Sequence, residues 1–147
     1  MLSGKSFHSL DAKNRLIIPH NHRLELGLAL YATVGYDNNL IIMSKAVYEA
    51  TAEKIAHSSS EFLEENRELR RDFFGNVAYC EIDKAGRILI PQYLLDLAGI
   101  SKEVVIIGVY DKLEVWSKEA YEQAQAAYTQ ERKNAVLKKL AEKEQQA

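Results

Sequence analysis

The sequence predicts an α+β fold in which a unit of β-hairpin, short helix and β-hairpin occurs twice. Two ten-residue stretches carry this prediction, because residues 10–19 read LDAKNRLIIP and residues 82–91 read IDKAGRILIP. Eight residues after the proline of each stretch comes a glycine, Gly27 in the first and Gly99 in the second. The offset between the copies is 72 residues up to these glycines and 73 further on. Such a regular recurrence indicates a duplicated structural unit.

Each copy should begin with a hairpin. Residues 5–10 read as a strand and residues 15–18 as its return strand. In the DAKN turn between them, the aspartate can bond the backbone two residues on, and Asn14 tolerates the left-handed conformation. Gly86 stands at the matching place in the second copy, and Gly and Asn are the residues that best accept a positive φ. We therefore expect a bulged hairpin in both copies, with residues 87–90 as the second return strand.

A proline ends each return strand, because proline donates no ladder hydrogen bond but suits the first turn of a helix. A short helix should follow, closed by the glycine that comes eight residues later. Apolar stretches then predict a second hairpin in each copy, residues 30–34 with 40–43 and residues 104–107 with 113–116. A unit of about 45 residues buries too little surface to be stable alone, so the two copies should share one core.

Helices should also connect and follow the copies. Ser44 can cap a helix to about residue 57, and Ser58-Ser59-Ser60 breaks it. Ser58 with Glu61 then fits a capping box for a second helix that runs through Arg71. Ser117 opens a polar, Ala-rich C-terminal helix that could reach Lys143. The predicted organisation is a first repeat (1–48), linker helices (49–76), a second repeat (77–121) and a C-terminal helical extension (122–147), all in one structural domain (1–147).

Composition bounds the class of protein. The hydrophobic fraction of 47% and the charged fraction of 27% are typical of a soluble globular chain. Cys80 is the single cysteine, which excludes an intramolecular disulfide and a cysteine metal cluster and fits a reducing compartment. The N-terminus carries no apolar run, and no segment could span a bilayer, so we expect a cytoplasmic protein.

Charge is distributed unevenly between the copies. The net charge is −2, yet residues 1–48 carry five Lys/Arg against three acids, whereas residues 77–121 carry five against seven. Three of the four histidines also lie in the first copy. If one half of the chain contacts a polyanion, the first copy is the better candidate.

The repeated frame resembles the MraZ family. Two further signals are the opening Met1-x-x-Gly4-x-x-x-His8-x-Leu10-Asp11 and the Phe73-Phe74-Gly75 before the second copy, so the resemblance covers roughly residues 1–121. The family carries two DxxxR motifs in a swapped-hairpin fold related to the AbrB DNA-binding domains, which implies an AbrB-like barrel here.

The resemblance also implies a function. It is that of a transcriptional regulator at the promoter of the division and cell-wall operon, associated with the nucleoid. The family binds short direct repeats of double-stranded DNA as a ring-shaped homo-oligomer. The motif residues in this chain are Asp11 with Arg15 and Asp83 with Arg87. The chain departs from the family at Asn14, where Gly is usual, and at His20-Asn21-His22 after the first proline.

The motif arginines admit two interpretations. One is a local Asp–Arg bridge that fixes the turn, a role in which surface pairs contribute little. The other is that Asp11 orients Arg15 while its guanidinium reaches a phosphate or a guanine edge. We favour DNA contact for Arg15; for Arg87 a structural or inter-subunit role and DNA contact both stay open. Lys5, Lys13 and Arg23 are phosphate candidates, and each could also be a solvated surface residue. Lys84 completes the predicted DNA-binding set.

Other classes are less well supported. A nucleophile with a base partner, paired acids in an apolar pocket and a phosphate loop are all missing, so we expect no enzyme, no cofactor and no small-molecule substrate. His20 and His22 would not share a helix face and lack further ligands nearby, so a metal site is not expected. RNA binding would call for exposed aromatic residues on a strand face, and the sequence shows no such cluster. The main alternative is an oligomeric protein-interaction scaffold that does not bind DNA.

Overall fold

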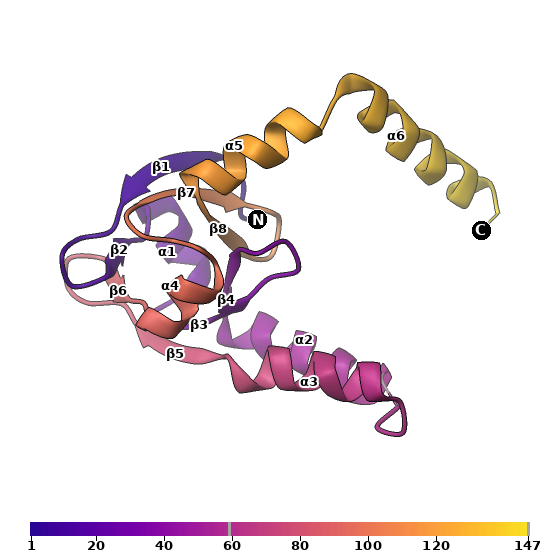
Figure 1. The fold of residues 1–147 in the computed structure, drawn as a ribbon. Helices are drawn as coiled ribbons and strands as arrows, with labels where there is room; N and C mark the ends of the chain where they lie inside the picture. Colours follow the sequence, from indigo (N-terminus) through magenta and orange to yellow (C-terminus); the bar gives the residue numbers. More distant parts are fainter. Residues whose placement is uncertain (59, 147) are drawn as a thin grey trace. The chain divides into compact units, whose positions relative to one another are not determined.

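The computed structural model describes residues 1–58 and 60–146, and it confirms the α+β class (Figure 1). Contacts divide the chain into two compact units, Met1–Ser117 and Lys118–Ala147. The domain boundaries expected from the sequence stay predictions. In chain order the elements are β1 (Lys5–Ser9), β2 (Arg15–Ile17), α1 (His20–Leu26), β3 (Ala29–Val34), β4 (Leu40–Ser44), α2 (Lys45–Ser58), α3 (Glu64–Gly75), β5 (Ala78–Glu81), β6 (Arg87–Leu89), α4 (Gln92–Leu97), β7 (Glu103–Gly108), β8 (Leu113–Ser117), α5 (Lys118–Ala127) and α6 (Gln130–Gln145).

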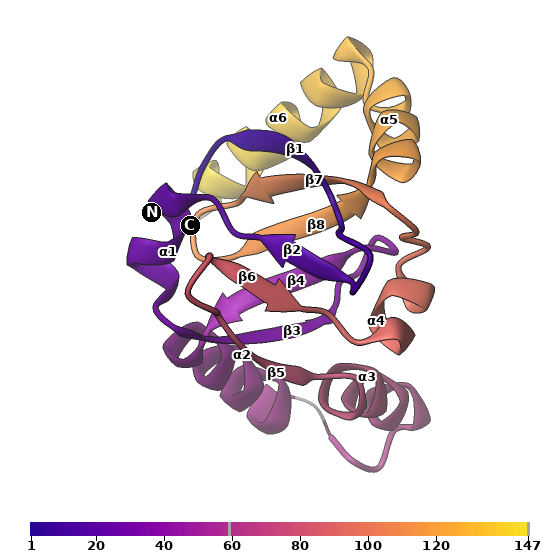
Figure 2. The ribbon, with the colours of Figure 1, turned by 90° about the vertical axis from the view of Figure 1, so that its left-hand side faces the viewer.

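Six strands form one antiparallel sheet in the order β1-β7-β8-β4-β3-β5. The other two, β2 and β6, pair only with each other as a short ribbon in front of that sheet (Figure 2). The predicted second hairpin of each copy is confirmed, since β3 pairs with β4 and β7 with β8. Every remaining pairing joins one copy to the other: β1 to β7, β5 to β3, β4 to β8 and β2 to β6. The two copies are therefore interleaved.

The predicted first hairpin of each copy has its turn but not its ladder. In the first copy the Asp11 N–H donates to the Arg15 carbonyl at 3.1 Å and the Asn14 N–H to the Asp11 carbonyl at 3.0 Å. However, β1 pairs with β7 and β2 with β6, so the expected pairing of residues 5–10 with 15–18 is wrong. The six-stranded sheet also keeps two open edges, β1 and β5, and the described strands do not close into a barrel.

Interleaving has a physical reason in the core. Leu16 of β2 and Ile88 of β6 are cross-strand partners and are both fully buried (0% exposed). They belong to a single apolar cluster with sheet residues from both copies, among them Leu30 and Val115. The shared core expected from the small size of each unit is thereby confirmed. A local hairpin would give each return strand only its own copy to pack against.

The opposite face of β3 and β4 packs against the linker helices. Met43, Ile55 and Phe73 form a second apolar cluster, and Tyr48 stacks between Tyr31 and Phe73 with ring centroids 4.5 and 5.7 Å away. Strand alternation explains this arrangement, because neighbouring residues along β3 point to opposite faces. The helices α2 and α3 thus lie on the face of the sheet away from the β2–β6 ribbon.

The helix predictions were right near the prolines and less accurate elsewhere. Helices α1 and α4 follow Pro19 and Pro91, and Ser44 caps α2 by accepting from the Val47 N–H at 3.3 Å. The capping box expected from Ser58 and Glu61 is wrong. Ser58 is the last residue of α2, and its hydroxyl donates to the Lys54 carbonyl. Ser59 of the predicted break lies outside the described residues, and α3 begins only at Glu64 and continues to Gly75.

The single C-terminal helix predicted from Ser117 to Lys143 is also wrong, since α5 ends at Ala127 and α6 begins at Gln130. Thr129 is the N-cap of α6 and accepts a hydrogen bond from the Arg132 N–H at 3.2 Å. Threonine favours such a cap over a helix interior, which accounts for the interruption. None of the helices described is both long and apolar enough to cross a membrane.

Candidate nucleic-acid interface

The carboxylate of Asp11 closes the first turn. Its Oδ1 accepts hydrogen bonds from the backbone N–H groups of Lys13 and Arg15, both at 2.9 Å. Its Oδ2 accepts from Nε of the Arg15 side chain at 2.6 Å. Asn14 adopts a φ of 61°, as expected for the left-handed position. The motif aspartate therefore both stabilises the turn and orients the arginine side chain.

The second turn repeats this closure. Oδ1 of Asp83 accepts from the backbone N–H groups of Ala85 and Arg87, both at 2.9 Å, and its Oδ2 accepts from Nε of Arg87 at 2.9 Å. Gly86 takes the place of Asn14 with a φ of 82°. These contacts show why the motif needs Asp and Arg four residues apart, because a carboxylate at that spacing reaches both the turn amides and the arginine.

These hydrogen bonds lower the pKa of both carboxyl groups. For Asp11 the largest cause is the bond from the Arg15 backbone N–H, and the Arg15 side chain adds to it. For Asp83 the corresponding groups of Arg87 have the same effect. Both aspartates are therefore charged at neutral pH and hold their arginines as ion pairs.

The pairing of β2 with β6 places the two arginines on one surface. The register sets Arg15 opposite Leu89 and Ile17 opposite Arg87, while Leu16 and Ile88 pair on the inward side. Side chains at alternate positions share a face. The outward face of the ribbon therefore carries Arg15, Ile17, Arg87 and Leu89, which we call the ribbon face.

Each copy contributes two residues to the ribbon face, and the first turn also contacts the arginine of the second copy. Nη1 of Arg87 lies 4.0 Å from Oδ2 of Asp11, so this carboxylate holds the arginines of both copies. In the described part of the chain, no hydrogen bond or ion pair occupies the two terminal nitrogens of Arg15. Arg15 and Arg87 side chains are 30% and 31% exposed, respectively, so both guanidinium groups are accessible to a ligand.

Each turn is supported by the short helix of the other copy. Arg23 of α1 donates from Nε to the Ile18 carbonyl at 2.6 Å. Its guanidinium covers Gly86, where an added Cβ would lie 2.1 Å from the guanidinium carbon. Gln92 of α4 accepts a hydrogen bond from the Asn14 side-chain amide at 2.9 Å. We call Arg23 and Gln92 the cross-repeat supports.

Sequence reasoning found only part of this arrangement. It named Arg23 as a phosphate candidate without its contact to the second turn, and it did not single out Gln92. One signal was present in the sequence, because Asn14 and Gly86 differ at matching positions of the duplicated turn. That difference indicates that the two turns pack against different residues.

The lysine candidates lie in two places. Lys13 and Lys84 are exposed residues of the two turns, next to the ribbon face. Lys5 begins β1, where its register partner is Ile107, so the whole strand separates it from the turn that follows. At about 3.3 Å per residue this separation is on the order of 15–20 Å. The structure thus brings together every predicted DNA-binding residue except Lys5.

The histidines form no metal site among the residues described, since no group of three or more His, Cys, Asp or Glu side chains could hold an ion. Nε2 of His8 is 2.7 Å from the Ser6 hydroxyl, His20 is exposed and His22 is buried. Burial lowers the pKa of His8 and, with a smaller effect from the neighbouring His8, that of His22. Both are therefore neutral at pH 7.

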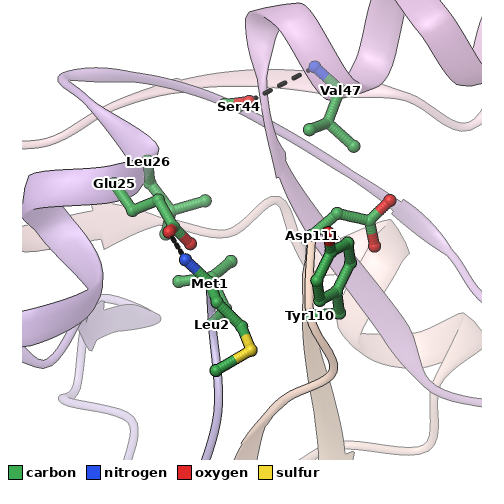
Figure 3. Close-up of a pocket in the computed structure, with 8 residues that line it drawn as sticks. All are labelled: Met1, Leu2, Glu25, Leu26, Ser44, Val47, Tyr110 and Asp111. Carbon is green, nitrogen blue, oxygen red and sulfur yellow. Dashed lines mark hydrogen bonds and ion pairs between the residues drawn. The ribbon is translucent and has the colours of Figure 1, made fainter.

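A pocket of about 330 Å³ is lined by residues of the N-terminus, α1, the end of β4, α2 and the β7–β8 turn (Figure 3). Each of the two carboxylates that line this pocket forms an ion pair within the protein. The Met1 amino group pairs with Glu25, and Nζ of Lys112 lies 2.8 Å from Oδ1 of Asp111. None of the predicted site residues lines it.

Comparison with known proteins places the chain in a family. The model of the family described as "MraZ protein, putative antitoxin-like" matches twice, at residues 1–71 and 73–143, once for each copy. The relatives include three proteins named "Transcriptional regulator MraZ". The protein of Lachnoclostridium phytofermentans is 39% identical over 122 residues, 83% of this chain and 85% of the relative. That of Mesomycoplasma hyopneumoniae (strain 7448) is 39% identical over 136 residues, 92% of each chain. That of Mycoplasma mobile is 41% identical over 140 residues, 95% of this chain and 92% of the relative.

These names are those of regulators and not of enzymes, as the absence of catalytic motifs led us to expect. Both copies of the DxxxR motif, the turns that they close and the length of the match agree with one assignment. The chain belongs to the MraZ family.

Proposed function

We propose that this chain is a transcriptional regulator that binds double-stranded DNA through the ribbon face. One observation carries the proposal: Arg15 and Arg87 come from different copies, share one outward surface, and are each oriented by an aspartate through Nε. A two-stranded ribbon fits the major groove, and an arginine fork pairs with the O6 and N7 acceptors of guanine. The relatives named as transcriptional regulators support this conclusion.

Local charge supports an anionic partner despite the net charge of −2. The two turns and Arg23 bring five basic side chains together with two carboxylates. Because both carboxylates are held within the protein, the surface offered to DNA is positive. Few phosphate contacts give weak, salt-sensitive binding from one copy of the chain.

We further propose that the chain acts as a ring-shaped homo-oligomer on short direct repeats at the promoter of the division and cell-wall operon, in the cytoplasm at the nucleoid. The family resemblance suggests this finer assignment, together with the AbrB relationship. Several ribbon faces on evenly spaced repeats would gain affinity by avidity without a highly charged subunit.

A gel-shift experiment tests the proposal, with the DNA upstream of the chain's own gene and a random duplex at several salt concentrations. Arg15→Ala should weaken binding at least about tenfold, the effect of losing one specific arginine contact. Arg87→Ala measures whether the second copy contacts DNA. Arg71→Ala is the matched control, because it removes the same charge from an exposed position on α3.

A sizing column must show that each variant keeps the assembly of the wild type. If Arg15→Ala and wild type bind equally, the ribbon face is not the DNA site. If neither DNA is shifted at low salt, the chain is an interaction scaffold, the main alternative.

A further inference from the structure

Two large aliphatic side chains stand on the ribbon face. Ile17 is 48% exposed and Leu89 is 60% exposed, whereas the preceding residues Leu16 and Ile88 are fully buried. They occupy matching places in the two copies, two residues after the motif arginine. A strand with one buried face normally carries polar residues at such outward positions. An aliphatic residue at this place in both copies therefore calls for a ligand that covers it.

Each aliphatic residue is the direct cross-strand partner of an arginine. Arg15 faces Leu89 and Arg87 faces Ile17, so the ribbon face consists of two arginine–aliphatic pairs. Directly opposed residues in an antiparallel ladder have Cβ atoms about 4.5–5.5 Å apart. This exceeds the rise of about 3.4 Å between successive base pairs by about 1–2 Å, a difference that flexible side chains can take up. The arginine and the aliphatic residue of one pair can thus contact two successive base pairs.

We propose that Ile17 and Leu89 contact the C5-methyl groups of thymines next to the bases contacted by Arg87 and Arg15. This inference rests on the proposed DNA binding and deepens it, because it assigns sequence discrimination to two residues outside the DxxxR motif. In the major groove the thymine methyl is the apolar group that a protein can contact, and it lies beside acceptors that suit arginine.

Charge favours the major groove over a protein partner for this surface. Both aliphatic residues are flanked by the motif arginines, and exposed Lys13 and Lys84 lie on the adjoining turns. Lysine is depleted in protein interfaces, whereas arginine is enriched there, so the two lysines are the residues that argue against a protein partner. DNA instead offers methyl groups and a negative potential in the same groove, so it satisfies both members of each pair.

Uracil DNA gives a direct test, because uracil differs from thymine only by this methyl group. The DNA upstream of the chain's own gene is amplified once with dTTP and once with dUTP, and the affinity of each protein for both products is measured by gel shift. Wild type should bind the uracil product more weakly, by about fourfold for each buried methyl. The double variant Ile17→Ser/Leu89→Ser should bind both products equally, and each single variant should lose part of the discrimination.

Leu137→Ser is the matched control, because it removes a 52% exposed leucine from α6. It should keep the full preference for thymine, and circular dichroism with a sizing column should show all variants folded and assembled. Equal affinity of wild type for both products would overturn the inference while leaving DNA binding intact. A uracil penalty that persists unchanged in the double variant would overturn it too, because the penalty would then come from DNA shape. If wild type does not bind the thymine product, the proposed function itself fails.

Discussion

The two DxxxR turns are closed in the same way but supported differently. In both, an aspartate accepts two backbone N–H bonds and one bond from Nε of the motif arginine. The first turn has Asn14 at positive φ and a neutral hydrogen bond to Gln92. The second has Gly86 at positive φ beneath the guanidinium of Arg23. Closure is thus a local property of the motif, whereas support is supplied by the other copy.

The difference shows how a duplicated unit can become asymmetric without losing its motif. At the repeat offset of 72 residues, Arg23 corresponds to Leu95, which is buried in the core, and Gln92 corresponds to the exposed His20. Neither support therefore exists in duplicate. Because Arg23 needs space above the second turn, that turn has a glycine where the first has an asparagine.

The largest expected effect comes from exchanging the positive-φ residues. Gly86→Asn keeps an allowed φ, but its Cβ displaces Arg23 from the Ile18 carbonyl, at a cost of about 1.5–3 kcal/mol for a bond from a charged donor. Gly86→Ala should cost about 1–2 kcal/mol more, because alanine tolerates the left-handed region poorly. Asn14→Gly should cost only about 1 kcal/mol. Urea unfolding at one fixed protein concentration measures all three.

Arg23→Ala provides the control for this exchange. Once the guanidinium is gone, Gly86→Asn meets no obstacle, so the double variant should be more stable than the sum of the single effects predicts. Coupling of residues in contact is about 0.5–3 kcal/mol. Strict additivity of Arg23→Ala and Gly86→Asn would show that Arg23 does not support the second turn.

The sequence predicted what is local to the motif. The Asp11 and Asp83 turns, the left-handed Asn14 and Gly86, and the helices after the prolines follow from short-range geometry, and the structure confirms them. The ladder partners of β1 and β2 could not be predicted in this way. A turn indicates a hairpin, but pairing is decided by where Leu16 and Ile88 become buried, and that depends on the other copy.

The same limit applies to the candidate site and the helix ends. DxxxR identified Arg15 and Arg87, yet the ribbon face that joins them exists only because β2 pairs with β6. The contact of Arg23 with Gly86 spans the two copies, so the sequence shows that the two turns differ at this position but not which residue lies against Gly86. At the helix ends, Ser58 bonds back to its own helix instead of capping the next, because a serine hydroxyl can serve either role.

A smaller difference is expected between Asp11 and Asp83 in how much folding stability each contributes as the pH falls. Both have a folded-state pKa below the ordinary 3.8, so the stability that they contribute is complete above that value and is lost as the pH falls through the lowered pKa. Asp11→Asn should remove more of this acid dependence than Asp83→Asn, because Nη1 of Arg87 also lies 4.0 Å from Asp11. Urea midpoints measured between about pH 6 and pH 3 test the order. Equal effects would mean that the contact between the copies contributes nothing.

The smallest effect belongs to Gln92, the support of the first turn. Its hydrogen bond with Asn14 joins two neutral groups at an exposed site, so Gln92→Ala should cost only about 0.5 kcal/mol, the lower end for such bonds. Gln92 also donates to Asp96 at 2.8 Å, so Asp96→Ala is needed to measure that contact alone. In an Asn14→Gly background, the part of the cost that is due to the turn should disappear. If the cost of Gln92→Ala is the same in both backgrounds, the first turn depends on its aspartate alone, and only the second turn is supported by the other copy.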